Sequence, residues 1–225
     1  MILVAGDTNV CGPDPTSKKR KTRMELSPER TAVIAVHCQG DIVSADGAFA
    51  PFFHEQIVSR NIIGKIGELL ASARENGMTV IYTRVAFRPD FSDLNANSPL
   101  LKVVEQSGCL KDGSALADII PELAPAAEDV VITHQRVGGF VPELTAVLEE
   151  RGIDTLVFAG VATNASLEGT ARAASDAGYR VIIAEDASSA ATLVAHQASI
   201  ESLGLLAEIA SVADIMTSTP ASQAV

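Results

Sequence analysis

Cysteine is scarce in this sequence, and so are the features of membrane and secreted proteins. The three cysteines, Cys11, Cys38 and Cys109, are odd in number and unrelated in spacing, which argues against a disulfide framework or a zinc knuckle. No apolar run approaches the roughly 20 residues that span a bilayer, and the amino terminus lacks a basic segment followed by a signal-type apolar stretch. We therefore expect a soluble cytoplasmic protein in a reducing compartment, with no membrane partner.

Positive charge is also in short supply. The 17 Lys and Arg residues face 28 Asp and Glu residues, which gives a formal net charge of −11. A strongly negative chain is a poor partner for a polyanion or an anionic membrane surface, so nucleic acid is not expected as a partner. The basic run at residues 18–23 is a local exception, and we interpret it as a solvated tail.

Length and composition fit one well-buried α/β domain. The chain has 225 residues, of which 47% are hydrophobic and 20% are charged. Residues 1–26 are rich in Gly, Pro, Asp and Lys and have no sustained periodicity, so we predict an N-terminal arm there. The domain itself is expected over residues 27–217, with residues 218–225 as a C-terminal tail.

Short apolar runs alternate with segments of helical periodicity along the predicted domain. Strands are expected at residues 31–38, 79–85, 130–134, 155–160, 180–184 and 210–212, and helices at 56–75, 141–151, 165–177 and 192–203. This alternation implies parallel pairing and right-handed crossovers, hence a three-layer α/β/α sandwich. Residues 86–113 are too polar and irregular for a long element, and we expect a loop with short helical pieces over the strand ends.

The segment Gly160-Val161-Ala162-Thr163-Asn164-Ala165-Ser166 closes a predicted buried strand and opens a predicted helix. A side chain at a helix start lies among unpaired backbone N–H groups, at the positive end of the helix dipole. Developing negative charge is stabilised there. The segment is therefore a suitable place for acyl chemistry.

The residues around this segment resemble the isochorismatase-like hydrolases, the cysteine hydrolase superfamily that includes nicotinamidases and carbamoyl-sarcosine amidases. The similarity lies in three stretches, Arg151–Asn164, Thr170–Arg172 and Gly178–Val181, and extends from about Glu29 to Met216. The resemblance implies the strand order 3-2-1-4-5-6, in which ligands bind at the carboxyl ends of the strands where the order reverses. It also implies a cis peptide between Val161 and Ala162, and an oxyanion hole formed by the N–H groups of Ala162 and Ser166.

The same resemblance implies a catalytic Asp, Lys and Cys, but none of these residue types stands at its matching position. His37 lies where the family has its Asp, His134 where it has its Lys, and Ser166 where it has its Cys. A serine hydroxyl becomes a useful nucleophile when a neutral imidazole within about 3 Å removes its proton. We therefore expect Ser166 to be the nucleophile, His37 the base, and His134 an auxiliary acid or a substrate anchor.

Other polar residues near these positions are candidates for substrate binding. Arg136 is a possible clamp for a carboxylate or carbonyl group, with a structural role in the loop as the alternative. Asp41 is a further candidate, although it is as well suited to fixing the loop or orienting His37. The remaining substrate-binding candidates are Gln39 and Thr163, with the aromatic residues Phe140, Phe87, Phe91, Phe49 and Phe52 as possible walls of the pocket. Cys38 adjoins His37 but should face away from it, as a buried structural residue.

No metal or cofactor is expected. Some relatives in the resembled family carry a zinc site with an Asp-x-His pair after the second strand, and residues 84–88 here contain no such ligand. His37 and His134 alone are an incomplete ligand set for zinc. We expect a homodimer or homotetramer, with residues 86–113 and the N-terminal arm at the interface.

Three functions are compatible with these residues. The first is hydrolysis of an amide, ester or related acyl bond in a small organic molecule, with Ser166 as the nucleophile. The second is non-covalent acid/base chemistry by His37 and His134, as in a lyase, an isomerase, a vinyl-ether hydrolase or a cofactor-free oxidative enzyme. The third is a non-catalytic binding protein on the same fold.

Overall fold

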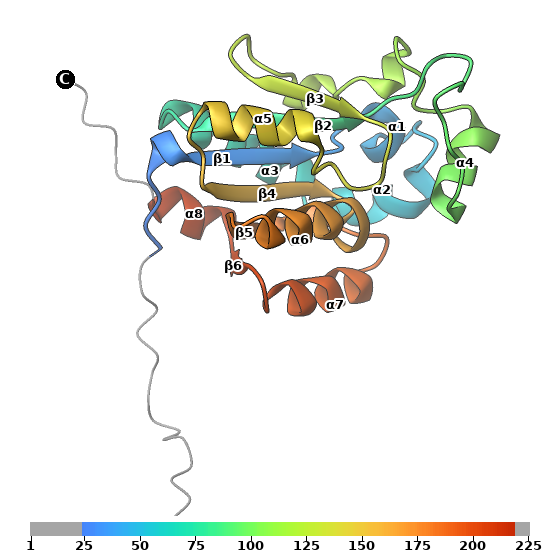
Figure 1. Ribbon diagram of the computed structural model, residues 1–225. Helices are drawn as coiled ribbons and strands as arrows, with labels where there is room; N and C mark the ends of the chain where they lie inside the picture. Colours follow the sequence, from blue (N-terminus) through green and yellow to red (C-terminus); the bar gives the residue numbers. More distant parts are fainter. Residues whose placement is uncertain (1–23, 219–225) are drawn as a thin grey trace, which may run out of the picture.

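A single parallel β-sheet organises the protein. The computed structural model describes residues 24–218 (Figure 1). Within them the six strands of the sheet follow the order β3-β2-β1-β4-β5-β6, with every neighbouring pair parallel. The strands are β1 (Thr31–Val36), β2 (Thr79–Val85), β3 (Val130–His134), β4 (Thr155–Val161), β5 (Arg180–Ser189) and β6 (Glu208–Ala210). The predicted order 3-2-1-4-5-6 is confirmed.

Helices cover both faces of the sheet. They are α1 (Gly40–Val43), α2 (Ala50–Ser59), α3 (Ile62–Glu75), α4 (Pro99–Ser107), α5 (Pro142–Glu150), α6 (Glu168–Asp176), α7 (Leu193–Leu203) and α8 (Val212–Ser218). In Figure 1, α5 and α6 cross the near face and α3 lies behind the sheet, while α1, α2 and α4 gather at the carboxyl ends of the strands. The predicted three-layer sandwich is therefore confirmed.

Strand β1 shows why its sequence, TAVIAV, is apolar throughout. Val33 and Ala35 belong to the hydrophobic core shared with α3, while Ala32, Ile34 and Val36 belong to the core shared with α5 and α6. A central parallel strand is buried on both faces, so alternation of polar and apolar residues is lost. All six residues of β1 are buried.

Several element boundaries differ from those predicted. The helix expected over 56–75 is two helices, because Asn61 adopts a left-handed backbone (φ 52°) between α2 and α3. Strand β1 ends at Val36, because His37 is also left-handed (φ 51°). Strand β5 continues to Ser189, and β6 lies at Glu208–Ala210 because Val212 already begins α8.

The two ends of the described chain meet at the amino ends of the strands. Leu26 is buried in the core, and its N–H donates a hydrogen bond of 3.3 Å to the Ser218 carbonyl. Most of the predicted arm, with Cys11 and the basic run, lies outside the described residues. Among residues 24–218, no helix is both long and apolar enough to cross a membrane.

Cys38 is a structural residue, as predicted. Its side chain is fully buried in the core, and its thiol lies 3.8 Å from the Val36 carbonyl oxygen. Burial raises the pKa of the Cys38 thiol to about 12, so the reactive thiolate is not populated at neutral pH.

The backbones of β1 and β4 lie close together at Gly160. This residue pairs with Val36 and has a φ of +126°, which side chains of L residues rarely adopt. A Cβ atom at Gly160 would lie 2.2 Å from the Val36 carbonyl oxygen. Only glycine therefore lets the two strands end side by side.

Replacing Gly160 with alanine should lower the free energy of unfolding by more than about 3 kcal/mol, since a backbone clash is added to an unfavourable φ. Gly178 is the matched control, because its φ of +94° is also positive but a Cβ there meets nothing within 4 Å. Gly178→Ala should cost only about 1–2 kcal/mol. Urea unfolding of both variants, followed by circular dichroism, measures the two losses, and equal losses would contradict this account.

Candidate active site

A cavity of about 250 Å³ opens at the carboxyl ends of β1 and β4, where the strand order of the sheet reverses. This is the position at which open α/β sheets bind ligands. Of the residues predicted to act chemically, His37, Ser166, Ala162 and Arg136 line the cavity. The sheet thus brings together groups from β1, β4 and the segment after β3.

His37 enters the cavity because the backbone turns immediately after β1. Its N–H donates a hydrogen bond of 2.9 Å to the Thr83 carbonyl of β2, and its left-handed φ departs from the extended strand. The side chain is only 3% exposed. In a continued strand, the alternation of side chains between the two faces would fix the direction of the His37 ring. The turn after β1 changes that direction.

His134 ends β3 and lies behind His37. The Nε2 atoms of the two rings are 3.1 Å apart, and the ring centroids are 5.1 Å apart. His134 is itself buried and is not among the residues that line the cavity. It therefore touches the site through His37, and its predicted role as a direct substrate anchor does not fit this position.

Both imidazoles are held neutral. Burial lowers the pKa of His134 to about 4, although the nearby backbone of Arg136 acts in the opposite direction. Burial, and then the proximity of His134, lower the pKa of His37 well below 6.5. At pH 7 each ring has one N–H and one bare nitrogen, so in the contact between the rings one Nε2 donates and the other accepts.

Two buried polar atoms beside the histidine pair lack partners of normal geometry within residues 24–218. They are His134 Nδ1 and Thr83 Oγ1. Gly139 closes the same space, because a Cβ atom there would lie 2.9 Å from His134 Nε2 and 3.2 Å from Thr83 Cβ. The ring of His134 is thus packed tightly at Nε2, the atom that contacts His37.

Ser166 lies in a π-helical turn, Thr163–Leu167, that joins β4 to α6. The peptide between Val161 and Ala162 is cis, as the family resemblance implied. The Ser166 carbonyl accepts a hydrogen bond of 2.6 Å from Thr170 Oγ1, which in turn accepts the Gly139 N–H at 2.8 Å. These two bonds tie the Ser166 turn to the segment that follows His134.

The Ser166 hydroxyl and His37 line the same cavity but are not hydrogen-bonded to each other in the described structure. Catalytic hydrogen bonds are often long in the absence of substrate and shorten when it binds. The arrangement therefore provides a hydroxyl and a neutral base that face one space.

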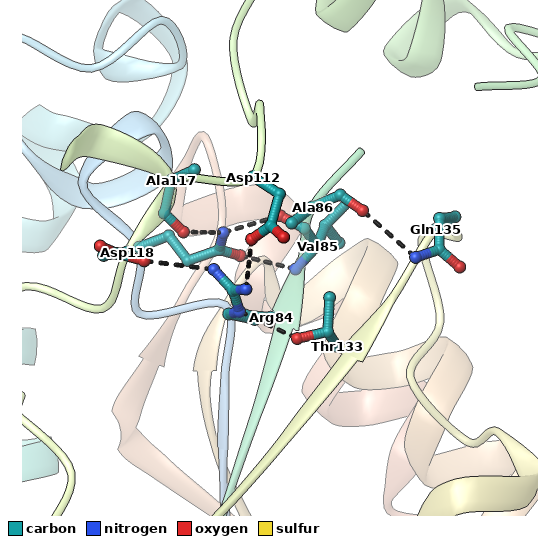
Figure 2. Close-up of polar contacts among 9 residues, drawn as sticks. Arg84, Val85, Ala86, Asp112, Ala117, Asp118, Thr133 and Gln135 are labelled. Carbon is teal, nitrogen blue, oxygen red and sulfur yellow. Dashed lines mark hydrogen bonds and ion pairs between the residues drawn. The ribbon is translucent and has the colours of Figure 1, made fainter. Parts of the chain in front are cut away.

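Arg136 and Arg84 differ in what they are free to do. The Arg84 side chain donates to Asp112 at 2.6 Å, to Asp118 at 3.2 Å and to Thr133 Oγ1 at 2.9 Å (Figure 2). The exposed guanidinium of Arg136 lines the cavity and has no ion pair or side-chain hydrogen bond among the described residues. Arg136 therefore remains available to a ligand.

Gln39 and Asp41 lie outside the cavity, and their prediction as substrate-binding residues is corrected. The Gln39 amide donates to the Val85 and Ala117 carbonyls at 2.7 and 2.6 Å, and its oxygen accepts the Val85 N–H at 2.7 Å. Asp41 Oδ2 accepts the Leu110 N–H at 2.7 Å. Both side chains are occupied in holding residues 86–118, which we call the covering segment.

Figure 2 shows part of this attachment at the ends of β2 and β3. Arg84 binds the covering segment through Asp112 and Asp118, and Gln135 Nε2 donates to the Ala86 carbonyl at 3.2 Å. Hydrogen bonds as well as ion pairs thus join the strand ends to the covering segment. Water-exposed ion pairs alone would hold the segment only weakly. As predicted, the segment contains a short helix, α4.

The aromatic wall was predicted only in part. Phe49 and Phe52 line the cavity as expected, and Phe53 joins them. Phe87 is fully buried in the core with its ring edge-on to Phe91, and Phe140 packs on Tyr179 at the other face of the sheet. The substrate-binding roles predicted for Phe87 and Phe140 are therefore corrected.

The substrate-binding role predicted for Thr163 is also corrected, because this residue is fully buried. Its hydroxyl is bound to His196, a histidine that the sequence did not mark as functional. His196 Nε2 accepts from the Arg60 guanidinium at 3.1 Å, so the neutral ring carries its proton on Nδ1 and donates to Thr163 Oγ1 at 2.9 Å. Burial lowers the pKa of His196 to about 4, with Arg60 adding to the effect. This contact braces the Ser166 turn from α7.

Helix α4 contributes the cavity residues that sequence reasoning assigned to an interface instead. Ser98 caps the helix by accepting the Leu101 N–H at 3.3 Å, and Gly108 ends it with a φ of 69°. Leu101 and Val104 are buried on one side of α4 and line the cavity. Their spacing of three residues is the signal that marks this face.

Within the described part of the chain, no group of three or more His, Cys, Asp and Glu side chains is arranged to hold a metal ion. The Nε2 atoms of His37 and His134 are hydrogen-bonded to each other and are not arranged around a shared position for a metal ion.

Comparison with known proteins agrees with this geometry. Residues 31–218 match the isochorismatase domain. The chain is 29% identical over 203 residues to the uncharacterized isochorismatase family protein YecD of Escherichia coli O157:H7, covering 86% of this chain and 98% of that protein. It is 30% identical over 183 residues to the ureidoacrylate amidohydrolase RutB of Acinetobacter baylyi, covering 76% and 75% of the two chains.

Solved structures point the same way. A cysteine hydrolase from Pseudomonas syringae pv. phaseolicola superposes with a TM-score of 0.78 at 28% identity, covering 87% of this chain and 95% of that one. An isochorismatase family protein from Burkholderia thailandensis superposes with a TM-score of 0.72 at 25% identity, covering 88% and 98%. With the domain matched over nearly all of its described length, the chain belongs to the isochorismatase family of hydrolases.

Proposed function

We propose that this protein hydrolyses an amide or ester bond of a small organic molecule, with Ser166 as the nucleophile and His37 as the base. The observation that carries the proposal is that His37 and Ser166 line one cavity while His37 Nε2 is bound to His134. The similarity to an amidohydrolase supports an amide as the bond that is cleaved.

The hydrogen bond between the two rings decides which nitrogen acts. His37 Nε2 is engaged by His134, so the nitrogen left for Ser166 is His37 Nδ1. To accept a proton, Nδ1 must be bare, which places the proton of neutral His37 on Nε2. His37 then donates to His134 Nε2, and His134 carries its own proton on Nδ1.

The reaction then has two halves. As Ser166 Oγ bonds to the substrate carbonyl carbon, its proton moves to His37 Nδ1, and the N–H groups of Ala162 and Ser166 stabilise the oxyanion. Breakdown expels the amine or alcohol, which takes the proton from His37. Water attacks the acyl-enzyme with His37 again as base, and the carboxylic acid leaves while Ser166 regains its proton.

In this arrangement His134 is a positioning residue, since it contacts His37 and not the cavity. It fixes the tautomer of His37, as the aspartate does in a Ser-His-Asp triad, but it carries no negative charge. Arg136 at the rim binds a carbonyl or carboxylate of the substrate.

A second function is favoured by one specific observation. The contact between His37 and His134 is formed in the described structure, whereas the contact between Ser166 and His37 is not. Non-covalent acid/base chemistry would use the histidine pair directly and would leave Ser166 without a chemical role.

The homodimer or homotetramer, the cytoplasmic location and the independence of metal and cofactor stay predictions.

Replacing Ser166 with alanine separates the two functions. If Ser166 is the nucleophile, Ser166→Ala should lower kcat by several orders of magnitude and leave ligand binding intact. Ser166→Cys should retain part of the activity and become sensitive to iodoacetamide, because a helix start lowers the pKa of a thiol. Steady-state kinetics and mass spectrometry of a trapped acyl-enzyme measure both. More than about a tenth of wild-type turnover in Ser166→Ala would exclude covalent catalysis.

The dependence of kcat/KM on pH reports the state of His37. A base acts only when neutral, and the pKa of His37 is lowered from 6.5, so activity should be retained at pH 7 and fall on the acid side below pH 6.5. Rates measured from pH 4 to 9 test this. An acid limb centred above pH 6.5 would remove His37 in its buried, neutral form as the base.

A matched pair of glycines tests His134 without changing it. Gly139→Ala would push a methyl group to 2.9 Å from His134 Nε2, whereas a Cβ at Gly138 meets no atom closer than 3.7 Å. Gly139→Ala should therefore lower kcat at least about tenfold with little change in KM, and Gly138→Ala should leave both near wild type. Nuclear magnetic resonance of the imidazole protons shows whether the ring contact is broken. Equal kinetics in the two variants would argue against a positioning role.

A further inference from the structure

The cavity beside Ser166 is walled mainly by hydrocarbon. Phe49, Phe52 and Phe53 form one wall at the start of α2, with ring centroids 6.1 to 6.2 Å apart. Leu101 and Val104 of α4 form another. Phe52 is 49% exposed, an unusual position for so large an apolar side chain, and a ligand body lying against it would cover it.

The charges around the cavity are as informative as its walls. Arg136, at the exposed rim, is the only residue with a permanent charge among those that line it, and no Asp, Glu or Lys is included. His37 is held neutral by burial. A negatively charged group could pair only with Arg136. A charged or strongly hydrated body against the phenylalanines and α4 would lose its water without gaining a partner there.

The volume limits how large the body can be. The cavity measures about 250 Å³. An apolar protein cavity of about 150 Å³ holds one benzene molecule. The space therefore admits a hydrocarbon group of roughly six carbons together with the reacting carbonyl group.

We propose that the substrate carries an uncharged hydrocarbon acyl group of about four to six carbons, which lies between the phenylalanines of α2 and the apolar face of α4. This inference rests on the proposed function, because Ser166 and His37 fix where the carbonyl carbon is attacked. Phe52, Leu101 and Val104 are then the residues that determine chain-length specificity.

A series of unbranched primary amides tests the proposal directly, because their leaving group is always ammonia. Wild-type kcat/KM for acetamide, propanamide, butanamide, pentanamide and hexanamide is measured by ammonia release. It should rise about fourfold with each added methylene until the cavity is full. A flat or falling series would overturn the proposal. So would higher activity on succinic acid monoamide, which has butanamide's chain length but ends in a carboxylate.

Two substitutions on α2 give a matched control. Phe52→Ser removes part of the cavity wall and should reduce the gain per methylene to less than about twofold. Val58→Ser, on the same helix, changes a side chain that is 63% exposed and outside the cavity, and it should leave the series unchanged. An unaltered series in Phe52→Ser would contradict the assigned binding wall.

Binding to Ser166→Ala distinguishes failure of this inference from failure of the proposed function. Calorimetric affinities for the same amides should rise along the series even though the variant cannot form an acyl-enzyme. A rising affinity without any wild-type turnover would keep the hydrocarbon site and reject hydrolysis. Turnover with no dependence on chain length, and affinities that do not rise, would keep hydrolysis and reject the hydrocarbon site.

Discussion

The close approach of two backbones, at Val36 of β1 and Gly160 of β4, is the constraint on which the site depends. A parallel sheet sets its strands side by side, but the chain must also leave both strands in directions that converge. At Gly160 the absence of a Cβ atom permits a φ of +126° against the Val36 carbonyl. His37 and Val161 follow Val36 and Gly160 in the chain, so the base and the nucleophile turn begin from neighbouring points.

The site works with little charge, and this distinguishes it from a site built on Asp, Lys and Cys. An acid and an ammonium group must be paired to be stable in a buried place, whereas two neutral imidazoles need no counter-ion. His37 and His134 are joined by the 3.1 Å contact between their Nε2 atoms. As a consequence, three phenylalanines and α4 can form an apolar surrounding without burying an unpaired ion.

The sheet could be predicted from the sequence, and so could the positions of His37 and Ser166 at its edge. These features depend on the order of strands and helices along the backbone. Apolar runs mark buried strands, and the strand order followed from resemblance to a known family. The directions of individual side chains could not be predicted in the same way. Gln39 and Asp41 bind the covering segment, and Thr163 binds His196, through contacts between residues far apart in sequence. Phe53 lines the cavity because α2 begins at Ala50, earlier than the helix predicted at 56–75, whereas Phe87 is buried in the core.

The buried histidines also give the fold a built-in sensitivity to acid. His134 and His196 have pKa values lowered to about 4, and that of His37 is lowered as well, while in an unfolded chain each would be near 6.5. Below pH 6.5 these histidines therefore bind protons in the unfolded chain but stay unprotonated in the native chain. The stabilisation is complete above that pH and is lost as the pH falls toward 4, by at most about 1.4 kcal/mol per pH unit for each histidine. The neutrality that keeps the base ready at pH 7 thus becomes, in an acidified medium, a driving force for unfolding.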